Sequence, residues 1–317
     1  MEVSFSAMSR LARRRLTEGM TNSSNASSNA SSASNASSAS NASNAKDTGD
    51  AVTLVIGGTG KTGRRVAEKL LLRGRRVRVG SRAADPAFDW NLPATWGPAL
   101  DGVDRVYVTY YPDLAFPGAP EQIGAFADAA VAAGAGRLVL LSGRGEDAAR
   151  AAEDRMKESG ADWTVVRASW FNQNFDEGFF REPVLAGQIA LPTGHAVEPF
   201  VDTDDIADVV VAALTDDRHI GRTYELSGPR LLSFADAAAE LSKATGREIS
   251  YLPVSAEDYR AVLRENGLPE ELADLFTLIL DGRNAHLVHG VEEVLGRGPK
   301  DFADFAREAA ATGVWDA

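Results

Sequence analysis

The chain has 317 residues, of which 44% are hydrophobic and 25% charged, a balance that is typical of a folded protein and excludes disorder throughout. No run of about 18 apolar residues occurs, and the formal net charge of −12 argues against nucleic acid as a main partner. Cysteine is absent, which excludes disulfides, thiolate catalysis and zinc–thiolate sites, so we expect a cytoplasmic protein without membrane or nucleic-acid partners.

Residues 1–50 have the composition of an extension rather than of a folded domain. Residues 22–45 contain only Asn, Ser and Ala, which cannot bury enough apolar surface to offset the entropy of ordering. An Arg cluster at 13–15 precedes this tract, and two interpretations stay open: a transit peptide or a plain upstream extension with Met20 as an alternative start. We predict that the extension is disordered.

From Ala51 onward, short β-rich runs alternate with helical patterns, which is typical of a parallel α/β sheet. In chain order the predicted strands are 52–56, 76–79, 88–90 as a short candidate, 103–109, 137–141, 163–167 and 224–227. Between the earlier strands, the predicted helices are 61–73, 121–133 and 147–159. The C-terminal third is more helical, with helices predicted at 234–245, 256–266, 269–280 and 302–311 and a strand at 249–254.

A glycine turn, Gly57-Gly58-Thr59-Gly60-Lys61-Thr62-Gly63, follows the first predicted strand and opens the first predicted helix. The Gly-x-x-Gly-x-x-Gly spacing allows the backbone to approach a pyrophosphate, whose charge the helix N–H groups would face. Because strand, turn, helix and second strand follow in order, a dinucleotide site is favoured over a tight turn without a ligand. A nucleoside-triphosphate P-loop is excluded, since that motif needs glycine at position 55, which is valine.

The second predicted strand is followed by Gly80, Ser81 and Arg82. An enzyme that prefers NAD usually has Asp or Glu near this point to hold the ribose 2′-hydroxyl. A hydroxyl and a guanidinium suit the 2′-phosphate of NADP instead. Asp85 lies past the strand end and is the weaker candidate, so the sequence predicts NADP(H) as the cofactor.

Three parts are therefore predicted. They are a disordered Arg-containing and Ser/Asn/Ala-rich extension at 1–50, an NADP-binding Rossmann core at 51–170, and a mixed region at 171–317. The last region is expected to complete the core and to form the substrate lid, with the chain crossing between the two parts more than once. The predicted fold class is α/β, with a Rossmann-type parallel sheet, helices on both faces and a smaller, mostly helical C-terminal lid.

The usual catalytic dyad of short-chain dehydrogenases, Tyr-x-x-x-Lys, is missing. None of the six tyrosines has Lys four residues later. Two explanations stay open at this point: the protein binds NADP without reducing anything, or its substrate needs no strong general acid. An iminium ion fits the second explanation, because it accepts hydride directly at carbon and needs only orientation and cation-stabilising groups.

Several longer stretches carry a family resemblance: Phe88-Asp89-Trp90 with Thr95-Trp96, Arg167 to Phe175, and Phe200-Val201-Asp202 with Asp204 to Ala207. From residue 51 onward the chain resembles the NmrA-like atypical short-chain dehydrogenase/reductases. More narrowly, it is similar to the fungal ergot-alkaloid reductases of the festuclavine synthase and agroclavine dehydrogenase type and their bacterial relatives. These relatives also lack the dyad, and a mild departure is Ala168, where the broader family usually has Pro.

The resemblance implies NADPH-dependent reduction of a C=N or activated C=C bond in a small, secondary-metabolite substrate. It places the nicotinamide near Ser142 and the loop Tyr110-Tyr111-Pro112, with Ser142 and Tyr111 as the candidate catalytic residues. The expected cofactor-binding residues are Gly57, Thr59, Gly60, Lys61, Thr62, Gly63, Ser81, Arg82, Tyr110 and Ser142. The expected substrate-side residues are Tyr111, Glu146, Trp170, Phe171, Asn172 and Asn174.

Some of these residues have structural interpretations as well. Tyr110 and Tyr111 could merely cover the sheet end, and Trp170 and Phe171 could belong to the core. Glu146 is a hypothesised contact for a cationic substrate, which the acidic balance of the chain would suit.

Three polar residues outside these sets also have structural interpretations. Asp204 precedes an apolar helix and is predicted to be its N-cap. His286 and His289 have the spacing of one helix face but no evident carboxylate partner, so no metal site is predicted.

Two other classes of function remain as alternatives. The missing dyad favours a non-catalytic NADP(H)-sensing protein of the regulatory NmrA type, or a Rossmann enzyme recruited to non-redox natural-product chemistry. The aromatic and amide cluster from Trp170 to Asn174 favours a pocket for a small molecule. The sequence names neither the substrate nor the oligomeric state.

Overall fold

The computed structural model describes residues 51–265, 270, 273–274, 276–277 and 280–316. The extension predicted at 1–50 lies outside the described residues, as does part of the helix predicted at 269–280. A parallel sheet of six strands forms the centre, in the order β2-β1-β3-β4-β5-β8. Its strands are β1 (Val52–Ile56), β2 (Arg76–Gly80), β3 (Arg105–Val108), β4 (Arg137–Gly143), β5 (Asp162–Ala168) and β8 (Arg222–Leu226).

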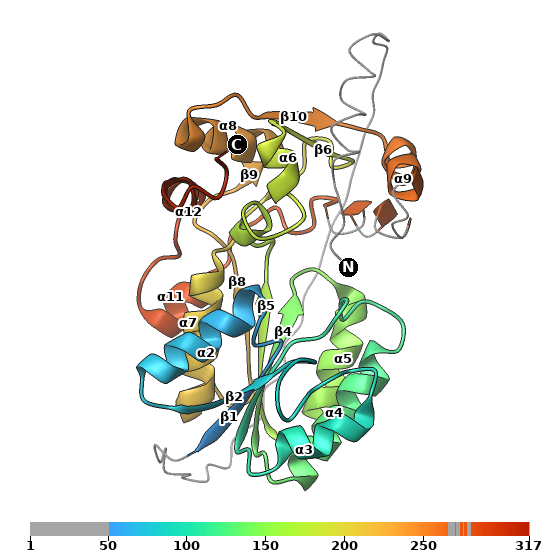
Figure 1. Cartoon of the computed structure of the whole chain (residues 1–317), viewed down its shortest axis with the longest axis vertical. Helices are drawn as coiled ribbons and strands as arrows, with labels where there is room; N and C mark the ends of the chain where they lie inside the picture. The colour runs from blue at the N-terminus through green and yellow to red at the C-terminus, as the bar shows by residue number, and fades with distance from the viewer. Residues whose placement is uncertain (1–50, 266–269, 271–272, 275, 278–279, 317) are drawn as a thin grey trace, which may run out of the picture.

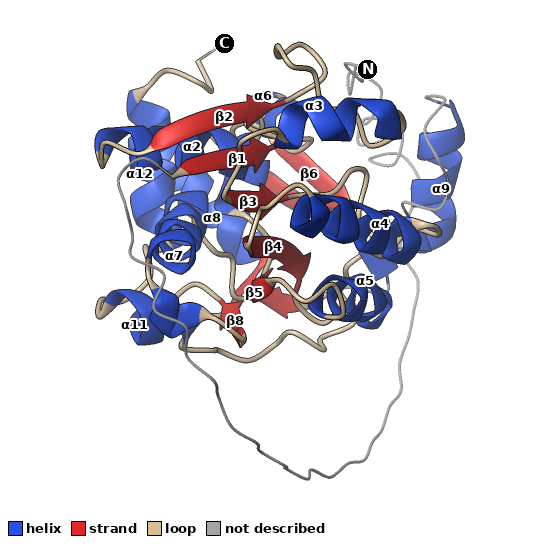
Figure 2. Ribbon diagram, turned by 90° about the horizontal axis from the view of Figure 1, so that it is seen from below, coloured by secondary structure: helices blue, strands red, loops and turns tan. Residues whose placement is uncertain are grey.

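Helices cover both faces of this sheet (Figure 2). One face carries α3 (Trp96–Leu100), α4 (Ala119–Ala132) and α5 (Asp147–Lys157). The other face carries α2 (Lys61–Leu72), α7 (Thr203–Thr215) and α11 (Gly290–Leu295). The predicted Rossmann-type class is confirmed. None of the helices in the described part of the chain combines the length and apolar character needed to span a bilayer.

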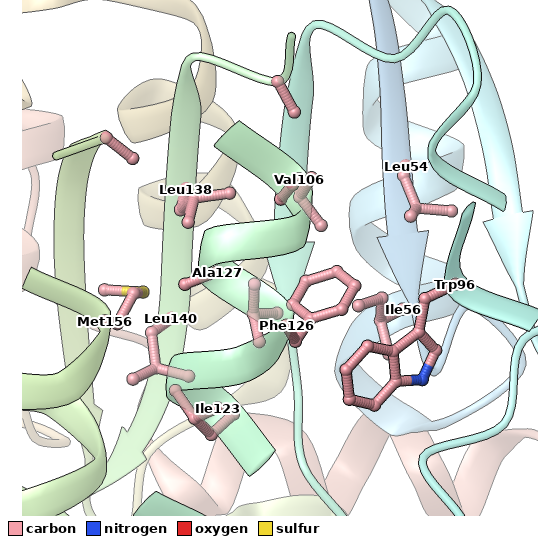
Figure 3. Packing of buried hydrophobic residues seen from close by; sticks show 14 of the residues in the cluster. Leu54, Ile56, Trp96, Val106, Ile123, Phe126, Ala127, Leu138, Leu140 and Met156 are labelled. Atoms are coloured by element: carbon pink, nitrogen blue, oxygen red, sulfur yellow. The ribbon is translucent and has the colours of Figure 1, made fainter. Parts of the chain in front are cut away.

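The core follows the alternation of side chains along each strand. In β1, Leu54 and Ile56 pack toward α4, where Phe126 is buried with them, as Figure 3 shows. Val55, between them, belongs to the cluster on the opposite face, with Val210 of α7. Because both faces are covered, the central strands β1, β3 and β4 are mostly apolar, as expected for a buried parallel sheet.

A smaller part lies above the carboxyl ends of the strands (Figure 1). It contains α6 (Arg181–Leu185), β6 (Gln188–Leu191), β7 (Val197–Glu198), β9 (Leu232–Ser233), α8 (Phe234–Thr245), β10 (Ser250–Pro253), α9 (Ala256–Glu265) and α12 (Phe302–Ala311). Strand β10 pairs in parallel with β6, and β7 pairs antiparallel with β9. Its core is rich in phenylalanine, including Phe175, Phe200, Phe234 and Phe302. The chain leaves this part to build α7 and β8, and the division near residue 170 stays a prediction.

The candidate strand 88–90 is wrong, because this segment is a loop. Its backbone groups bond to side chains instead of to a neighbouring strand. The N–H of Asp89 donates to Thr95 Oγ1 at 3.0 Å, and the indole of Trp96 donates to the Asp89 carbonyl at 3.0 Å. Phe88 and Trp90 are buried and meet edge-to-face. The apolar pattern therefore marks a core loop rather than a strand.

Two smaller predictions are also wrong. The N-cap of α7 is Asp202, whose Oδ1 accepts the N–H of Asp204 at 2.8 Å, so Asp204 belongs to the first turn of the helix. His286 lies in a loop and His289 is the residue before α11, so the two imidazoles do not share a helix face. Asp204 and His289 lie at loop–helix boundaries, where local patterns give the least information.

Candidate functional site

The glycine turn joins β1 directly to α2. Gly57 has a φ of +65°, which favours glycine, and its N–H donates to the Gly80 carbonyl at 2.9 Å. A Cβ on Gly63 would lie 2.2 Å from the Gly57 carbonyl oxygen, so the helix packs against the turn without room for a side chain. The turn is therefore as tight as a dinucleotide site requires.

The N-terminus of α2 has no side-chain cap. Its N-cap is Gly60, no side chain accepts the first N–H groups, and the first turn contains no acidic residue. Thr59 and Gly60 are exposed. The unpaired N–H groups and the positive end of the helix dipole can accept the negative charge of a pyrophosphate. The residues present thus fit the phosphate group of a dinucleotide.

Thr62, predicted to bind the cofactor, directs its side chain into the core. The buried hydroxyl of Tyr107 in β3 donates to Thr62 Oγ1 at 3.0 Å. Burial raises the pKa of Tyr107 above its ordinary value, so this hydroxyl stays protonated. Any contact of Thr62 with a cofactor would therefore come from its backbone N–H.

Ser81 and Arg82 follow the last residue of β2, beside the glycine turn. The Gly80 carbonyl accepts the N–H of Gly57, which ties the strand end to the turn. Arg82 is exposed and makes no hydrogen bond or ion pair within the described chain. Its guanidinium is therefore available for an anionic group next to the turn, as the 2′-phosphate assignment requires.

A cavity of about 390 Å³ lies at the carboxyl ends of β3, β4 and β5. This is the edge of an open parallel sheet where ligands generally bind, beside the point where the strand order reverses between β1 and β3. Of the sequence-predicted residues, the structure brings seven to its wall: Lys61, Tyr110, Ser142, Glu146, Trp170, Phe171 and Asn174. Phe179 and Phe276 of the smaller part close the opposite side.

Two predicted substrate residues do not reach this cavity. Tyr111 is 80% exposed and lies outside the lining, because its side chain points to solvent. Asn172 is fully buried, and its Nδ2 donates to Asp202 Oδ2 at 3.5 Å. The structure therefore does not bring these two side chains to the cavity as expected: one lies on the outer surface and the other supports the N-cap of α7.

Ser142 lies at the end of β4, but its hydroxyl already has a partner. The buried Oγ donates to Glu153 Oε1 at 2.8 Å. Arg167 holds the same carboxylate through two bonds, of 2.9 Å to Oε1 and 2.7 Å to Oε2. A hydroxyl whose proton is donated to a buried carboxylate is a poor acid, so we keep Ser142 as a wall residue rather than a proton donor.

Tyr110 and Trp170 both line the cavity, as predicted, and also pack against the core, as in the alternative interpretation. The Tyr110 hydroxyl donates to Gln122 Oε1 at 2.6 Å, and its ring lies 5.1 Å from Trp90. Trp170 packs against the core ring of Phe234 and, at 5.3 Å, against Phe276. One part of each of these two side chains therefore packs on the core, while another part lines the cavity.

Two further charged residues, Asp113 and Arg144, line the wall, and sequence reasoning missed the first of them. Asp113 lies in the loop after β3, and nothing in its sequence context distinguishes it from a solvated loop residue. The Arg144 side chain is only 1% exposed. It donates to Glu225 at 3.3 Å and to the Ser169 hydroxyl at 3.3 Å. Arg144 thus links β4, β5 and β8 beneath the cavity.

Glu198 in β7 is a buried carboxyl near this region. Neither of its oxygens has a hydrogen-bond partner among the described residues. Burial raises the pKa of Glu198 to about 8, although the charge of Arg144 acts in the opposite direction. The folded protein therefore holds Glu198 protonated at neutral pH.

Replacing Glu198 by Gln is expected to flatten the pH dependence of stability. The unfolded carboxyl loses its proton near its ordinary pKa of 4.5, whereas the folded one keeps it to about 8. Between these values the unfolded state binds fewer protons, so stability falls as pH rises, by about 1.4 kcal/mol per pH unit for one proton. Urea unfolding of wild type and variant across this range measures the difference. Glu182→Gln, at an exposed ion pair with Arg181, is the control. Equal slopes in wild type and Glu198→Gln would contradict the prediction.

The family model described as NAD(P)H-binding matches residues 57–217, half of the chain, from the glycine turn to the end of α7. The chain belongs to this family. A festuclavine dehydrogenase of Aspergillus fumigatus is 30% identical over 293 residues, which cover 81% of this chain and 97% of the relative. An NAD(P)H azoreductase of Xenophilus azovorans is 32% identical over 292 residues, 81% of this chain and 98% of the relative.

A solved structure of similar fold is the Citrobacter triphenylmethane reductase complexed with NADP(H). Its TM-score is 0.62 at 20% identity, and the match covers 82% of this chain and 99% of that one. The predicted place among NmrA-like atypical short-chain reductases, near the ergot-alkaloid enzymes, is confirmed. The chain is an NAD(P)H-dependent oxidoreductase. The roles assigned to single residues stay predictions.

Proposed function

We propose that this oxidoreductase uses NADPH to reduce a C=N or an activated C=C bond in a small, largely apolar molecule. The observation that carries the proposal is the composition of the cavity at the carboxyl ends of β3, β4 and β5. Aromatic rings from Trp170, Phe179 and Phe276 line it, and Lys61 of the glycine turn reaches its wall. The place for a substrate therefore lies directly beside the place for the cofactor.

Bound NADPH supplies the hydride. The turn from Gly57 to Gly63 and the uncapped N-terminus of α2 would hold the pyrophosphate, and Ser81 and Arg82 would hold the 2′-phosphate. Tyr110 and the backbone at Ser142 border the cavity and would orient the nicotinamide end. These contacts position the reacting groups and keep water away from them.

No tyrosine acid is available at this site. Tyr110 is the tyrosine that borders the cavity within the described chain, and its hydroxyl donates to Gln122. A substrate that accepts hydride at an electron-poor carbon is compatible with a site that has no tyrosine acid. The aromatic faces would stabilise a cationic substrate such as an iminium ion.

Two relatives support this substrate class. One is named a festuclavine dehydrogenase, and the other is named an azoreductase. An iminium ion, an enone and an azo compound share an electron-poor double bond, which accepts hydride readily. A flat conjugated molecule also suits a wall of aromatic rings.

The test is NADPH oxidation followed by absorbance, with a panel of cyclic imines, iminium ions, enones, quinones and azo compounds. We expect turnover of imines, iminium ions or enones. Tight NADPH binding without oxidation across the panel would contradict the proposal. That result would favour the NADP(H)-sensing alternative or a non-redox enzyme, for which the missing Tyr/Lys dyad is the specific observation.

A further inference from the structure

Two acidic side chains share one part of the cavity wall. Glu146 precedes α5, and Asp113 lies in the loop after β3. Asp113 lies close enough to act directly on the Glu146 carboxyl. Two ionised carboxylates that share a site repel each other, which favours one proton on the pair. The cavity therefore favours a carboxylic acid beside a carboxylate.

The surroundings indicate which residue keeps the proton. The N–H of Ala115 donates to Asp113 Oδ1 at 2.8 Å, so this oxygen already acts as an acceptor. Glu146 is the N-cap of α5, yet its side chain accepts no backbone N–H there. Burial raises the pKa of Glu146 to about 8, and the negative charge of Asp113 adds to this effect. Glu146 is thus the acid of the pair at neutral pH.

The Glu146 carboxyl lies directly over Gly143, at the end of β4. A Cβ on Gly143 would be 2.1 Å from Glu146 Oε1, so only glycine leaves room for this arrangement. Gly143 follows Ser142, beside which the nicotinamide is predicted to bind. The proton is therefore held at the strand end that borders both the cofactor and the substrate positions.

From this juxtaposition we propose that Glu146, oriented by Asp113, is the general acid that protonates neutral substrates. The inference rests on the proposed reductase function. Hydride adds to the carbon of the double bond, the electron pair of that bond moves to the far atom or its conjugated oxygen, and this atom takes the proton from Glu146. Water then returns a proton to the carboxylate. One NADPH and one proton are consumed, and an iminium ion needs no such acid.

Other charged groups face the same space. Lys61 and Arg144 line the cavity, and Arg283 donates to the Gly145 carbonyl at 3.0 Å. Asp147, the next residue in the chain, is exposed, pairs with Arg150 and does not line the cavity. Burial lowers the pKa of Lys61 below its ordinary value. These cations favour ionisation of Glu146, so the pH at which activity falls reports the whole cluster rather than Glu146 alone.

The test compares an enone with a permanently charged N-methyl iminium ion, using Glu146→Gln. We expect enone turnover to fall on the order of 10²- to 10⁴-fold, as for loss of a general acid, and iminium turnover to be largely retained. The wild-type rate on the enone should decline above about pH 8, where Glu146 ionises, and the variant should lose this decline. Equal effects on both substrates, or none on the enone, would overturn the inference while leaving the reductase function intact.

Two further variants control this result. Asp147→Asn changes the next, exposed residue and should leave both rates unchanged. Gly143→Ala forces the Glu146 carboxyl away without removing it, and should reproduce the selective loss on the enone. This variant also tests the inference if Glu146→Gln fails to fold.

A readout without NADPH separates the two proposals. The infrared band of a protonated carboxyl, taken as the difference between wild type and Glu146→Gln, should disappear with a midpoint near pH 8. Absence of the band at neutral pH would overturn the inference. If the band is present and the wild type turns over neither substrate, both the reductase function and the catalytic role of Glu146 are contradicted. Only the interaction between the two acidic residues is then supported.

Discussion

Replacing Arg82 by Ala is expected to weaken NADPH binding on the order of 10- to 100-fold and to leave NADH binding almost unchanged. The exposed guanidinium has no acidic partner in the described chain, so its charge is available for the 2′-phosphate that distinguishes the two cofactors. Hydrogen bonds to a charged group contribute about 1.5–3 kcal/mol, which corresponds to this loss. Fluorescence titration with both cofactors measures it.

Two variants sharpen the Arg82 experiment. Arg82→Lys keeps the charge but loses the planar fork, so it should recover only part of the NADPH affinity. Asp85→Asn removes the carboxylate that could have favoured NADH, and should not change the preference. An equal loss of NADPH and NADH affinity in Arg82→Ala would contradict the assignment of the 2′-phosphate site.

Gly63→Ala is expected to reduce both the stability of the protein and its affinity for NADPH. The new Cβ would lie 2.2 Å from the Gly57 carbonyl oxygen and 2.9 Å from the Gly58 Cα, and both neighbours are backbone atoms that cannot rotate away. Overpacking of this kind costs about 1–3 kcal/mol or more, and here it also displaces the turn from α2. Both the melting temperature and NADPH affinity should fall.

The matched control is Gly97→Ala in α3. A Cβ at Gly97 meets no atom within 4 Å, and alanine is the better helix former. This variant should be as stable as the wild type or slightly more stable, with unchanged NADPH affinity. If Gly63→Ala and Gly97→Ala behave alike, the tight contact between the turn and the helix does not matter for the site.

The parallel sheet could be predicted because its strands are short apolar runs with clear helical patterns between them. The run from Val52 to Ile56 is buried on both faces, and the glycine turn follows it directly. The candidate strand at 88–90 has a similar apolar content. Its backbone groups bond instead to the side chains of Thr95 and Trp96, which no local pattern indicates.

Residues of the candidate site could be predicted from the sequence where their place at the end of a strand brings them to the cavity. Ser142 lies at the end of β4 and Trp170 follows β5, and both reach the cavity. The direction of a side chain is not encoded locally, so Tyr111 and Asn172 were assigned to the site although one faces solvent and the other the core. The partnership of Asp113 with Glu146 joins loops 33 residues apart and depends on the assembled sheet.

The central claim is that this chain moves a hydride from NADPH to a carbon of its substrate without a tyrosine acid. The most direct measurement uses NADPH with deuterium at both C4 positions and an iminium ion or an enone as substrate. The account predicts one deuterium on the product carbon that belonged to the double bond, in equal amount to the NADP⁺ formed. Product without deuterium, or NADPH that stays unoxidised while bound, would contradict it.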